Sequence, residues 1–553
     1  METARAIRRA PRYVVGLFFG LLLGLGGLLF SDYGVSWDEP IDRRNGLVSL
    51  RFVTSLVAPQ WTESQTLLHG VPSIRDYPDN DHGVLFELPL ALYDVLRPGT
   101  DLRTYYLVRH AAVFLVSLLG VWALYKLATL RFRDERLGLV AAGLLVLSPR
   151  FFAESFYNGK DLVFVGLFTL GIYTLVRLLE RPTWRRAVVH GLATAAATDV
   201  RILGLLLGPF TLALLALLLL SDASGPARRA LGRAALVYLL ALAAGVVAGW
   251  PYLWEHTLEH LAAAFASLSH FYWQGNLLYM GKVMAGSSIP WHYALVWMSI
   301  TTPVAYQVAG LLGLGVVAVR LISHPWATLR TAAGRLDFLT AGWLVAPLGL
   351  VIGLHSVIYD GWRHLYFVYP ALLLLAVQGG LAVARLARPG SAGRPLALGL
   401  GLLAGAEVLL TAGRMMRMHP HQQTYFSYLP GPLAERLFER DYWGLSIRQG
   451  LAYLVAHQPT GPIYLDTPVW TLVNSNKIWL PEADRSRLIE GPGQPGRYFL
   501  TFYRCKGTPY SPSVGEPVYH LRPDGVTILS IFQWTKPGPV PPQPPPESLS
   551  PEW

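Results

Sequence analysis

The sequence predicts an all-α polytopic membrane protein that carries a small α/β domain at its C-terminal end. Of its 553 residues, 52% are hydrophobic and 15% are charged, whereas soluble domains carry about 25% charged residues. Apolar runs long enough to cross a bilayer recur up to residue 413. After Met415 the hydropathy drops and turn residues become common. The composition therefore excludes an ordinary soluble protein and predicts a membrane part, 1–413, followed by an α/β part, 414–535.

Hydropathy places about eleven spans in the membrane part. They lie near residues 13–30, 106–130, 136–152, 161–179, 186–199, 202–220, 231–250, 291–320, 336–355, 364–387 and 395–413. The first connection, 31–105, is far longer than an ordinary loop, so we expect it to be structured. Within it, residues 41–57 and 84–96 are predicted to form helices that lie on the membrane surface.

The distribution of positive charge predicts the orientation. When the N-terminus is placed inside, the short basic connections all fall on the same side; they are 131–136, 177–186, 228–233, 320–335 and 385–394. Cytoplasmic loops of membrane proteins carry such an excess of Lys and Arg. The N-terminus is therefore predicted to be cytoplasmic and 414–535 to be extracytoplasmic. The net charge of +11 is then explained without a nucleic-acid partner, and membrane lipids surround the spans.

The C-terminal part contains alternating helix and strand patterns. Residues 435–456 are predicted to be helical, and 463–466, 498–503 and 526–532 to be strands. Residues 536–553 are rich in proline and are predicted to be a disordered tail. Cys505 is the single cysteine, which excludes an internal disulfide framework and a metal site built from cysteines.

The outer boundary of the predicted membrane part collects charged residues that hydropathy alone does not explain. The acids are Asp38, Glu39, Asp161, Asp199 and Asp360, and the cations are Lys160, Arg201 and Arg363, with His364 beside them. Cations at this boundary suit a phosphate, because guanidinium groups match phosphate oxygens. Carboxylates suit a general base or a divalent metal ion such as Mg or Mn, which prefers oxygen ligands. The pattern predicts a site that binds a phosphate donor and activates a hydroxyl.

Two alternatives stay open from the residues alone. Each cation could simply pair with its neighbour in sequence, as Lys160–Asp161, Asp199–Arg201 and Asp360–Arg363. The protein could also be a transporter or flippase of a lipid-linked substrate, which would place ionisable groups near the middle of the membrane. Glu407 is the clearest such group. The other charges cluster at one boundary, and this favours an enzyme.

The layout resembles the GT-C glycosyltransferase superfamily. A first span is followed by an outer Asp-Glu pair, two surface helices and a second outer loop that bears Lys160 and Asp161. The segment 148–161 is similar to a bacterial Asn-Pro-Lys-Asp element, with Gly159 in place of its proline, and 419–426 and 441–446 resemble a recurring element after the last span. The most similar families are bacterial protein O-mannosyltransferases and lipid A aminoarabinose transferases.

This resemblance implies an inverting enzyme of the bacterial plasma membrane. It would move a sugar from a polyprenyl-phosphate donor to a lipid, glycan or protein acceptor on the outer face. Asp38 would be the catalytic base, supported by Glu39, and Asp161 would orient the acceptor or share a divalent metal ion with Asp38. The donor phosphate would be held by Lys160, Arg201, Arg363 and His364.

Overall fold

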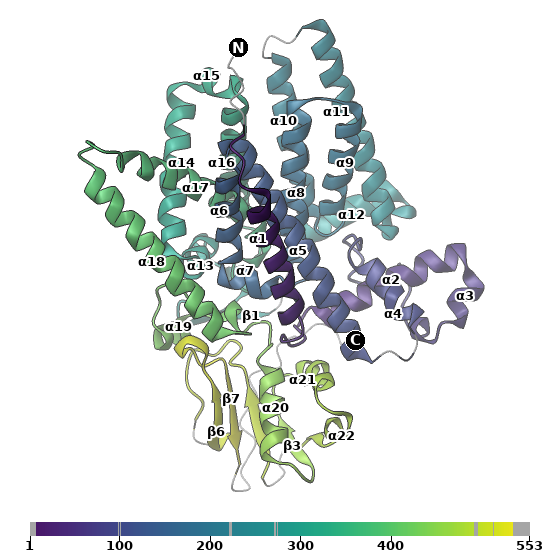
Figure 1. The fold of residues 1–553 in the computed structure, drawn as a ribbon. Helices are drawn as coiled ribbons and strands as arrows, with labels where there is room; N and C mark the ends of the chain where they lie inside the picture. The colour runs from purple at the N-terminus through teal and green to yellow at the C-terminus, as the bar shows by residue number, and fades with distance from the viewer. Residues whose placement is uncertain are drawn as a thin grey trace.

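The computed structural model describes residues 7–97, 99, 101–220, 224–269, 273, 275–491, 496–511 and 514–534. The predicted tail, 536–553, lies outside the described residues. The described chain forms a long helical bundle with a smaller part, which contains a sheet, at one end of it (Figure 1).

Nine helical segments among the described residues are long and apolar enough to cross a membrane. They are α1 (Arg12–Leu29), α5 (Leu102–Phe132), α8 (Asp161–Glu180), η2 with α10 (Ile202–Leu206 and Leu207–Leu220), α11 (Gly225–Gly249), α14 (Val304–Ser323), α16 (Ala332–Gly353), η5 with α17 (Arg363–Val368 and Tyr369–Leu386) and α18 (Arg394–Met418). Two other predicted spans correspond to shorter helices, α6 (Glu135–Val146) and α9 (Trp184–Thr198). Each predicted run thus contains a helix, and the predicted fold class is confirmed.

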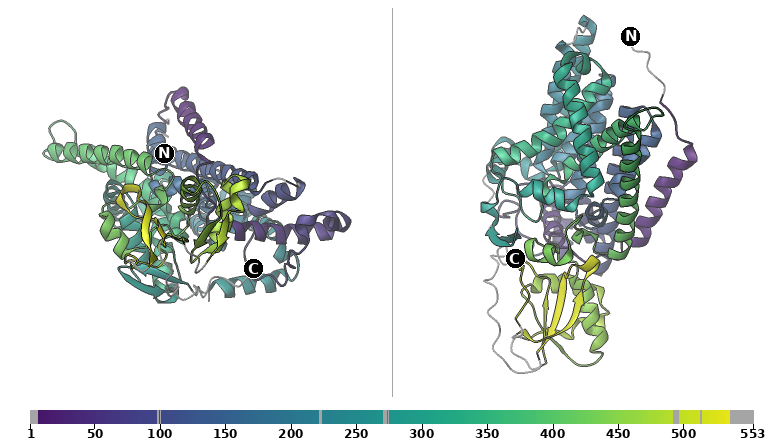
Figure 2. Two further views of the ribbon diagram at one scale, coloured as in Figure 1. Left: turned by 90° about the horizontal axis from the view of Figure 1, so that it is seen from below. Right: turned by 90° about the vertical axis from the view of Figure 1, so that its left-hand side faces the viewer.

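Shorter elements surround the end of the bundle that faces the sheet, apart from α15. They are α2 (Glu39–Val57), α3 (Pro59–Ser64), η1 (Thr66–Leu68), α4 (Glu87–Leu96), α7 (Pro149–Glu154), η3 (Pro251–Trp254), α12 (Thr257–Ser269), η4 (Gly286–Ser288), α13 (Tyr293–Thr301) and α15 (Pro325–Arg330), with the antiparallel pair β1 (Asn276–Tyr279) and β2 (Lys282–Ala285). The two helices predicted at 41–57 and 84–96 are present as α2 and α4. Together with α3 they project sideways from the bundle (Figures 1 and 2).

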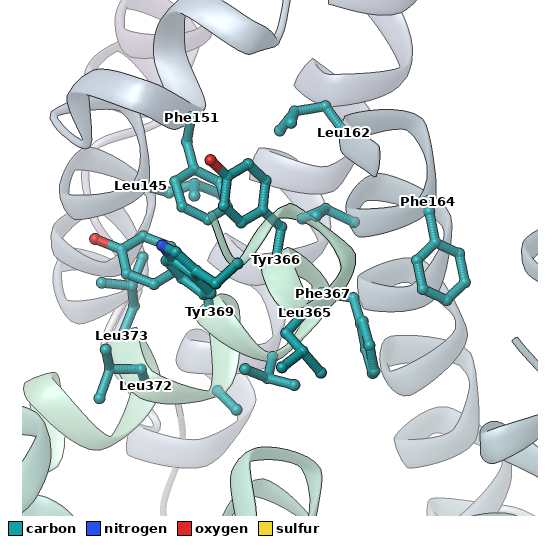
Figure 3. Packing of buried hydrophobic residues seen from close by; sticks show 14 of the residues in the cluster. Leu145, Phe151, Leu162, Phe164, Leu365, Tyr366, Phe367, Tyr369, Leu372 and Leu373 are labelled. Atoms are coloured by element: carbon teal, nitrogen blue, oxygen red, sulfur yellow. The ribbon is translucent and has the colours of Figure 1, made fainter. Parts of the chain in front are cut away.

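The core of the bundle lies where α6, α7, α8 and α17 meet (Figure 3). Phe151 of α7 stacks on Tyr369 of α17 with ring centroids 4.2 Å apart. Helices α14 and α17 approach closely because Gly313 and Gly379 face each other's helix, where a Cβ would overlap a backbone carbonyl oxygen. Small residues allow this kind of close packing between membrane helices. The core therefore fixes η5, at the start of the α17 segment, against α7 and α8.

The C-terminal part is a mixed five-stranded sheet with helices. Its strands are β3 (Ile463–Asp466), β4 (Leu488–Glu490), β5 (Tyr498–Thr501), β6 (Glu516–Leu521) and β7 (Leu529–Gln533), in the order β4-β3-β5-β7-β6. Its helices are η6 (Gln422–Thr424), α19 (Gly431–Leu437), α20 (Ile447–His457), α21 (Trp470–Asn476), η7 (Lys477–Trp479), α22 (Glu482–Arg485) and η9 (Pro523–Gly525). Strand β3 is parallel to β4 and β5, whereas β7 is antiparallel to β5 and β6. Apolar side chains of α20 pack on this sheet.

The three predicted strands are present, but the helix predicted at 435–456 is interrupted. Residues 438–446 leave α19 and run towards the bundle before α20 begins. Asp441 holds this bend, because its carboxylate accepts hydrogen bonds from the Ser446 N–H at 2.8 Å and from the Gln423 side chain at 3.2 Å. Gly444 adopts a φ of 70°, a left-handed conformation that ends a regular helix. Long-range contacts thus override the local helical pattern.

Candidate functional site

Arg363 connects two of the predicted carboxylates at the end of the bundle. Its Nη1 lies 2.8 Å from Asp38 Oδ2 and 3.4 Å from Asp161 Oδ2. Asp38 precedes α2, Asp161 begins α8, and Arg363 begins η5, so three distant segments meet here. The side chains differ in access to solvent: Asp38 is 25% exposed, Arg363 4% and Asp161 1%. Asp38 is therefore the more accessible of the two carboxylates.

Arg201 is the second cation at Asp161. It precedes η2 and forms an ion pair with Asp161 Oδ1. Asp199, its neighbour in sequence, is not its partner; the Asp199 side chain is buried, and its Oδ1 has no hydrogen-bond partner among the described residues. Arg201 and Arg363 thus converge on one buried carboxylate.

Asn158 fixes the orientation of Asp161. Its side-chain oxygen accepts a hydrogen bond from the Asp161 N–H at 2.8 Å, and its Nδ2 donates to Asp161 Oδ2 at 3.0 Å and to Glu154 Oε2 at 2.7 Å. Glu154 is buried and also accepts a hydrogen bond from the Tyr366 hydroxyl at 2.9 Å. Burial raises the pKa of Glu154 to about 7. The buried carboxyl group of Glu154 therefore helps to hold Asn158, which in turn orients Asp161.

Lys160 faces a different acid from the one that follows it. Its Nζ lies 3.2 Å from Asp42 Oδ1, and Asp42 follows Asp38 by one helical turn of α2. Burial lowers the pKa of the Lys160 ammonium, but the charges of Asp42, Asp79 and Asp38 outweigh this and raise it above its ordinary value. Lys160 is therefore a permanent cation, and its side chain remains 24% exposed.

Glu39 points into a buried network that holds the surface helices to the bundle. Its Oε2 accepts a hydrogen bond from the Ser36 N–H at 2.7 Å, and its Oε1 lies 3.0 Å from His110 Nε2. In the same network, Arg109 of α5 pairs with Asp42 of α2 at 2.8 Å and with Glu87 of α4. These contacts differ from those of Asp38, so support of Asp38 by Glu39 stays a prediction.

This network also explains why residue 159 is a glycine. A Cβ at position 159 would overlap Nη2 of Arg109. The space next to the Lys160 loop is thus filled by a buried guanidinium, and a proline ring at this position would displace it.

His364 lies beside the two arginines, but its contacts are with an aromatic ring and not with the carboxylates. Its ring packs edge-on against Tyr359, with centroids 4.7 Å apart, and its Nδ1 has no hydrogen-bond partner among the described residues. The Arg363 guanidinium lies over Tyr359 at 4.9 Å and over Trp443 at 4.8 Å. The aromatic rings hold the cation in place without neutralising it.

The C-terminal part contributes directly to the site. The Trp37 N–H, one residue before Asp38, donates a hydrogen bond to the Trp443 carbonyl oxygen at 3.1 Å. The Asn476 side chain accepts from the Val35 N–H and donates to the Val35 carbonyl oxygen, both at 2.9 Å. The loop that presents Asp38 is therefore fixed by residues more than four hundred positions further along the chain.

The carboxylates of Asp38 and Asp161 do not fit a shared metal ion in this arrangement, because one guanidinium nitrogen of Arg363 contacts both of them. The metal predicted there stays a prediction. Another group of the described residues could hold a metal ion: Asp79, Asp81 and His82 offer ligand atoms within 4.8 Å of one another. These are oxygen and nitrogen donors, which do not identify one metal.

Of the three neighbouring pairs considered as a structural alternative, the structure contains one. Asp360 Oδ2 lies 3.6 Å from Arg363 Nη2. Lys160 pairs with Asp42, and Arg201 pairs with Asp161. Long-range partners thus replace neighbours at two of the three positions.

Several residues of the site were not selected from the sequence. They are Asp42, Glu87, Arg109, Glu154, Asn158, Trp443 and Arg504. Asp42 could have been found, because it follows Asp38 by four residues and shares its helix face. Glu154 and Asn158 lie one turn apart in the segment that carries Asp161. No local pattern marks Arg109, which lies inside an apolar span, or Arg504, which lies in the C-terminal part.

The fold and this cluster define a multi-pass membrane protein with a carboxylate-and-arginine site at one end of its bundle. Residues 107–254 match the family model described as dolichyl-phosphate-mannose-protein mannosyltransferase. The matched segment contains Lys160, Asp161 and Arg201. The predicted resemblance to glycosyltransferases, and the enzyme class that it implies, are confirmed by this match. A search of curated proteins finds no match.

Solved structures of two membrane proteins match most of this chain at low sequence identity. ArnT from Cupriavidus metallidurans in the apo state is 15% identical, with a TM-score of 0.47 over 94% of this chain and 98% of that chain. The same protein bound to undecaprenyl phosphate is 14% identical, with a TM-score of 0.45 and the same coverage. The oligosaccharyltransferase AglB from Archaeoglobus fulgidus, in complex with an inhibitory peptide and a dolichol-phosphate, is 14% identical, with a TM-score of 0.43 over 87% of this chain and 65% of that chain. Similarity this low assigns no residue role.

Proposed function

We propose that this protein is an inverting glycosyltransferase that moves a sugar from a polyprenyl-phosphate donor to an acceptor hydroxyl on the outer face of the membrane. The observation that carries the proposal is the pairing of the accessible carboxylate of Asp38 with the guanidinium of Arg363, 2.8 Å apart. A base and a phosphate-binding cation thus share one end of the bundle. The family match over residues 107–254 supports the same class of reaction.

The geometry suggests how donor binding prepares the base. A phosphate is a stronger bidentate partner for a guanidinium than a single carboxylate oxygen is. When the donor phosphate binds Arg363 and Arg201, it draws Arg363 away from Asp38. The carboxylate oxygen that Arg363 contacted then faces the acceptor hydroxyl. Binding of the first substrate therefore frees the group that activates the second.

The chemical step would be a single displacement. Asp38 takes the proton of the acceptor hydroxyl, and the acceptor oxygen forms a bond to the anomeric carbon of the sugar. The bond between that carbon and the phosphate oxygen breaks, and its electron pair stays on the lipid phosphate. Arg363, Arg201 and Lys160 stabilise the charge of this leaving group. One displacement inverts the configuration at the anomeric carbon.

The other predicted residues have supporting roles in this proposal. Asp161, held by Asn158 and two arginines, keeps those arginines in place when the donor is absent. His364, whose ring packs edge-on against Tyr359, would contact the phosphate through its Nδ1. A divalent ion such as Mg or Mn would be held by Asp79, Asp81 and His82, whose ligand atoms lie within 4.8 Å of one another.

The rival function, transport of a lipid-linked substrate, loses its main support. Glu407, the acid inside a predicted span, accepts hydrogen bonds from the Val304 and Ala305 N–H groups at 2.6 and 2.5 Å. It therefore caps the start of α14, where free N–H groups favour a carboxylate. A structural role accounts for the charge that suggested a transport path.

The proposal is tested with two measurements on the purified protein. Mass spectrometry of the protein in detergent should detect a bound polyprenyl-phosphate lipid. Asp38→Asn should keep this lipid and lower the transfer rate by about 10²–10⁴-fold, the typical contribution of a general base. Asp32→Asn is the matched control, because Asp32 lies in the same loop but pairs with His419 at 2.8 Å. Full transfer activity in Asp38→Asn, or equal losses in both variants, would contradict the assignment of the base.

A further inference from the structure

Arg504, in the C-terminal part, is linked to the site by Asp360, which lies between Arg504 and Arg363. Its Nη1 lies 2.7 Å from Asp360 Oδ1, and Asp360 Oδ2 lies 3.6 Å from Arg363 Nη2. Arg504 follows β5, whereas Asp360 and Arg363 belong to the connection that enters α17. Asp360 is thus shared by two arginines, one from each part of the molecule. All three side chains are largely buried, and Arg504 is 13% exposed.

A second route joins the same two arginines through aromatic rings. Arg504 lies over the Trp273 ring at 5.8 Å, and Trp273 stacks on Tyr359 with centroids 4.3 Å apart and planes at 7°. The opposite end of this stack is Arg363, over Tyr359 at 4.9 Å. Two independent sets of contacts therefore make the position of Arg363 depend on the C-terminal part.

The backbone at Asp360 is in a conformation that needs outside support. Asp360 has a φ of 55° and Gly361 a φ of 75°, so two consecutive residues are left-handed. This region is unfavourable for a residue with a side chain. The Gly361 N–H donates a hydrogen bond to the Tyr293 hydroxyl at 3.1 Å, and the Asp360 carboxylate is held by its two arginines. The turn places the carboxylate where both guanidinium groups can reach it.

The charges determine what Arg504 does there. Asp360 without Arg504 would be a buried acid with Arg363 as its nearby cation, and it would attract Arg363 more strongly while repelling a phosphate. With Arg504 present, the charge of Asp360 is already balanced. We propose that Arg504 is a positioning residue, which neutralises Asp360 so that Arg363 remains available to the donor phosphate. This inference rests on the proposed function of Arg363.

The first test compares two buried arginines of the C-terminal part. Arg504→Gln should weaken binding of undecaprenyl phosphate, used as a sugar-free probe, by about tenfold, the size of one charge-assisted contact. It should raise KM for the donor more than it lowers kcat. Arg504→Lys should restore part of the affinity, because it keeps the charge. Arg497→Gln is the matched control: Arg497 is buried and lies over Trp534 at 4.2 Å, so its loss should lower stability and leave probe affinity unchanged.

The decisive test removes the acid as well. Arg504→Gln combined with Asp360→Asn should bind the probe about as well as the unsubstituted protein, because the Asp360 charge that Arg504 neutralises is then absent. A double variant that binds as weakly as Arg504→Gln would overturn the inference, as would unchanged affinity in Arg504→Gln. Arg363→Ala separates this result from the proposed function. Unchanged affinity in Arg363→Ala would refute phosphate binding by Arg363 itself, whereas lost affinity there with normal Arg504→Gln would refute only the role of Arg504.

Discussion

At the scale of single residues, the site depends on largely buried charges, each of which is paired with a charge of opposite sign. Asp161 is held by two arginines and one amide, and Asp38 keeps an exposed edge. Glu154 differs from both, because its partners are the neutral groups of Asn158, Tyr366 and Tyr442. A carboxyl group with neutral donors in a buried position gains little from ionisation. Its protonation should therefore affect stability within the physiological pH range.

We predict that Glu154 makes the stability of the protein fall between about pH 4.5 and pH 7. Burial raises its pKa from 4.5 to about 7 in the folded state. In this range the folded protein keeps a proton that the unfolded chain has lost, so stability decreases as pH rises and levels off above about pH 7. Relative to the unsubstituted protein, Glu154→Gln should gain about 3 kcal/mol of unfolding free energy over this range. Other titrating groups are common to both proteins and cancel.

The measurement is thermal or denaturant unfolding in detergent at several pH values for both proteins. Glu490→Gln is the control, because Glu490 is exposed on β4 and should leave the pH dependence unchanged. A pH dependence that is the same with and without Glu154 would show that this carboxyl group is ionised throughout.

The sequence could indicate some residues of the site and not others. Asp38, Arg201 and Arg363 stand out because they place charge at a predicted membrane boundary. The partners of these residues could not be predicted from the sequence. Arg201, for example, forms an ion pair with Asp161 and not with Asp199, which is closer in sequence. Arg504 lies in a part where charged surface residues are common, and its contact with Asp360 exists only in three dimensions.

At the scale of elements, the surface helices α2 and α4 are fastened to the bundle by one side chain of α5. Arg109 is fully buried and bonds Asp42 of α2 and Glu87 of α4. Hydropathy predicted all three helices, because each has a regular apolar pattern. The fastening was not predicted, because a single arginine in a long apolar run has little effect on the average. The single helix predicted at 435–456 is wrong for a related reason: tertiary contacts, which the local pattern does not contain, keep part of this segment out of a helix.

We predict that Arg109→Met destabilises the protein by about 3–5 kcal/mol, because it leaves buried carboxylates without their cation. The segment between α2 and α4 should then be cleaved faster by protease, as the two helices detach from α5. Limited proteolysis followed by mass spectrometry measures this. Arg103→Met, on an exposed position of the same helix over Trp479 at 5.7 Å, should change neither quantity much. Equal proteolysis of both variants would mean that packing, not Arg109, holds the surface helices.

At the scale of the whole molecule, different elements lie at the two ends of the bundle. The sheet and the site lie at one end, whereas α15 lies at the other (Figure 1). The N-terminal stretch joins the basic connection after α5, since the Arg8 N–H donates a hydrogen bond to the Arg133 carbonyl oxygen at 2.8 Å. These segments were predicted to share one side from charge alone, and the structure places them together. Their position relative to the cell stays a prediction.

We predict that the site and the C-terminal part face the outside, because α15 and the start of α11, which belong to basic connections, lie at the opposite end of the bundle (Figure 1), and such connections stay in the cytoplasm. Cys505 is the single cysteine, so Cys505→Ser provides a cysteine-free background for labelling. In that background, His457→Cys on α20 should react with a membrane-impermeant maleimide in intact cells, and Arg228→Cys at the start of α11 only after lysis. Both positions are exposed, so access to the reagent depends on the side of the membrane. Labelling of Arg228→Cys in intact cells, with His457→Cys protected, would reverse the orientation and place the proposed transfer reaction in the cytoplasm.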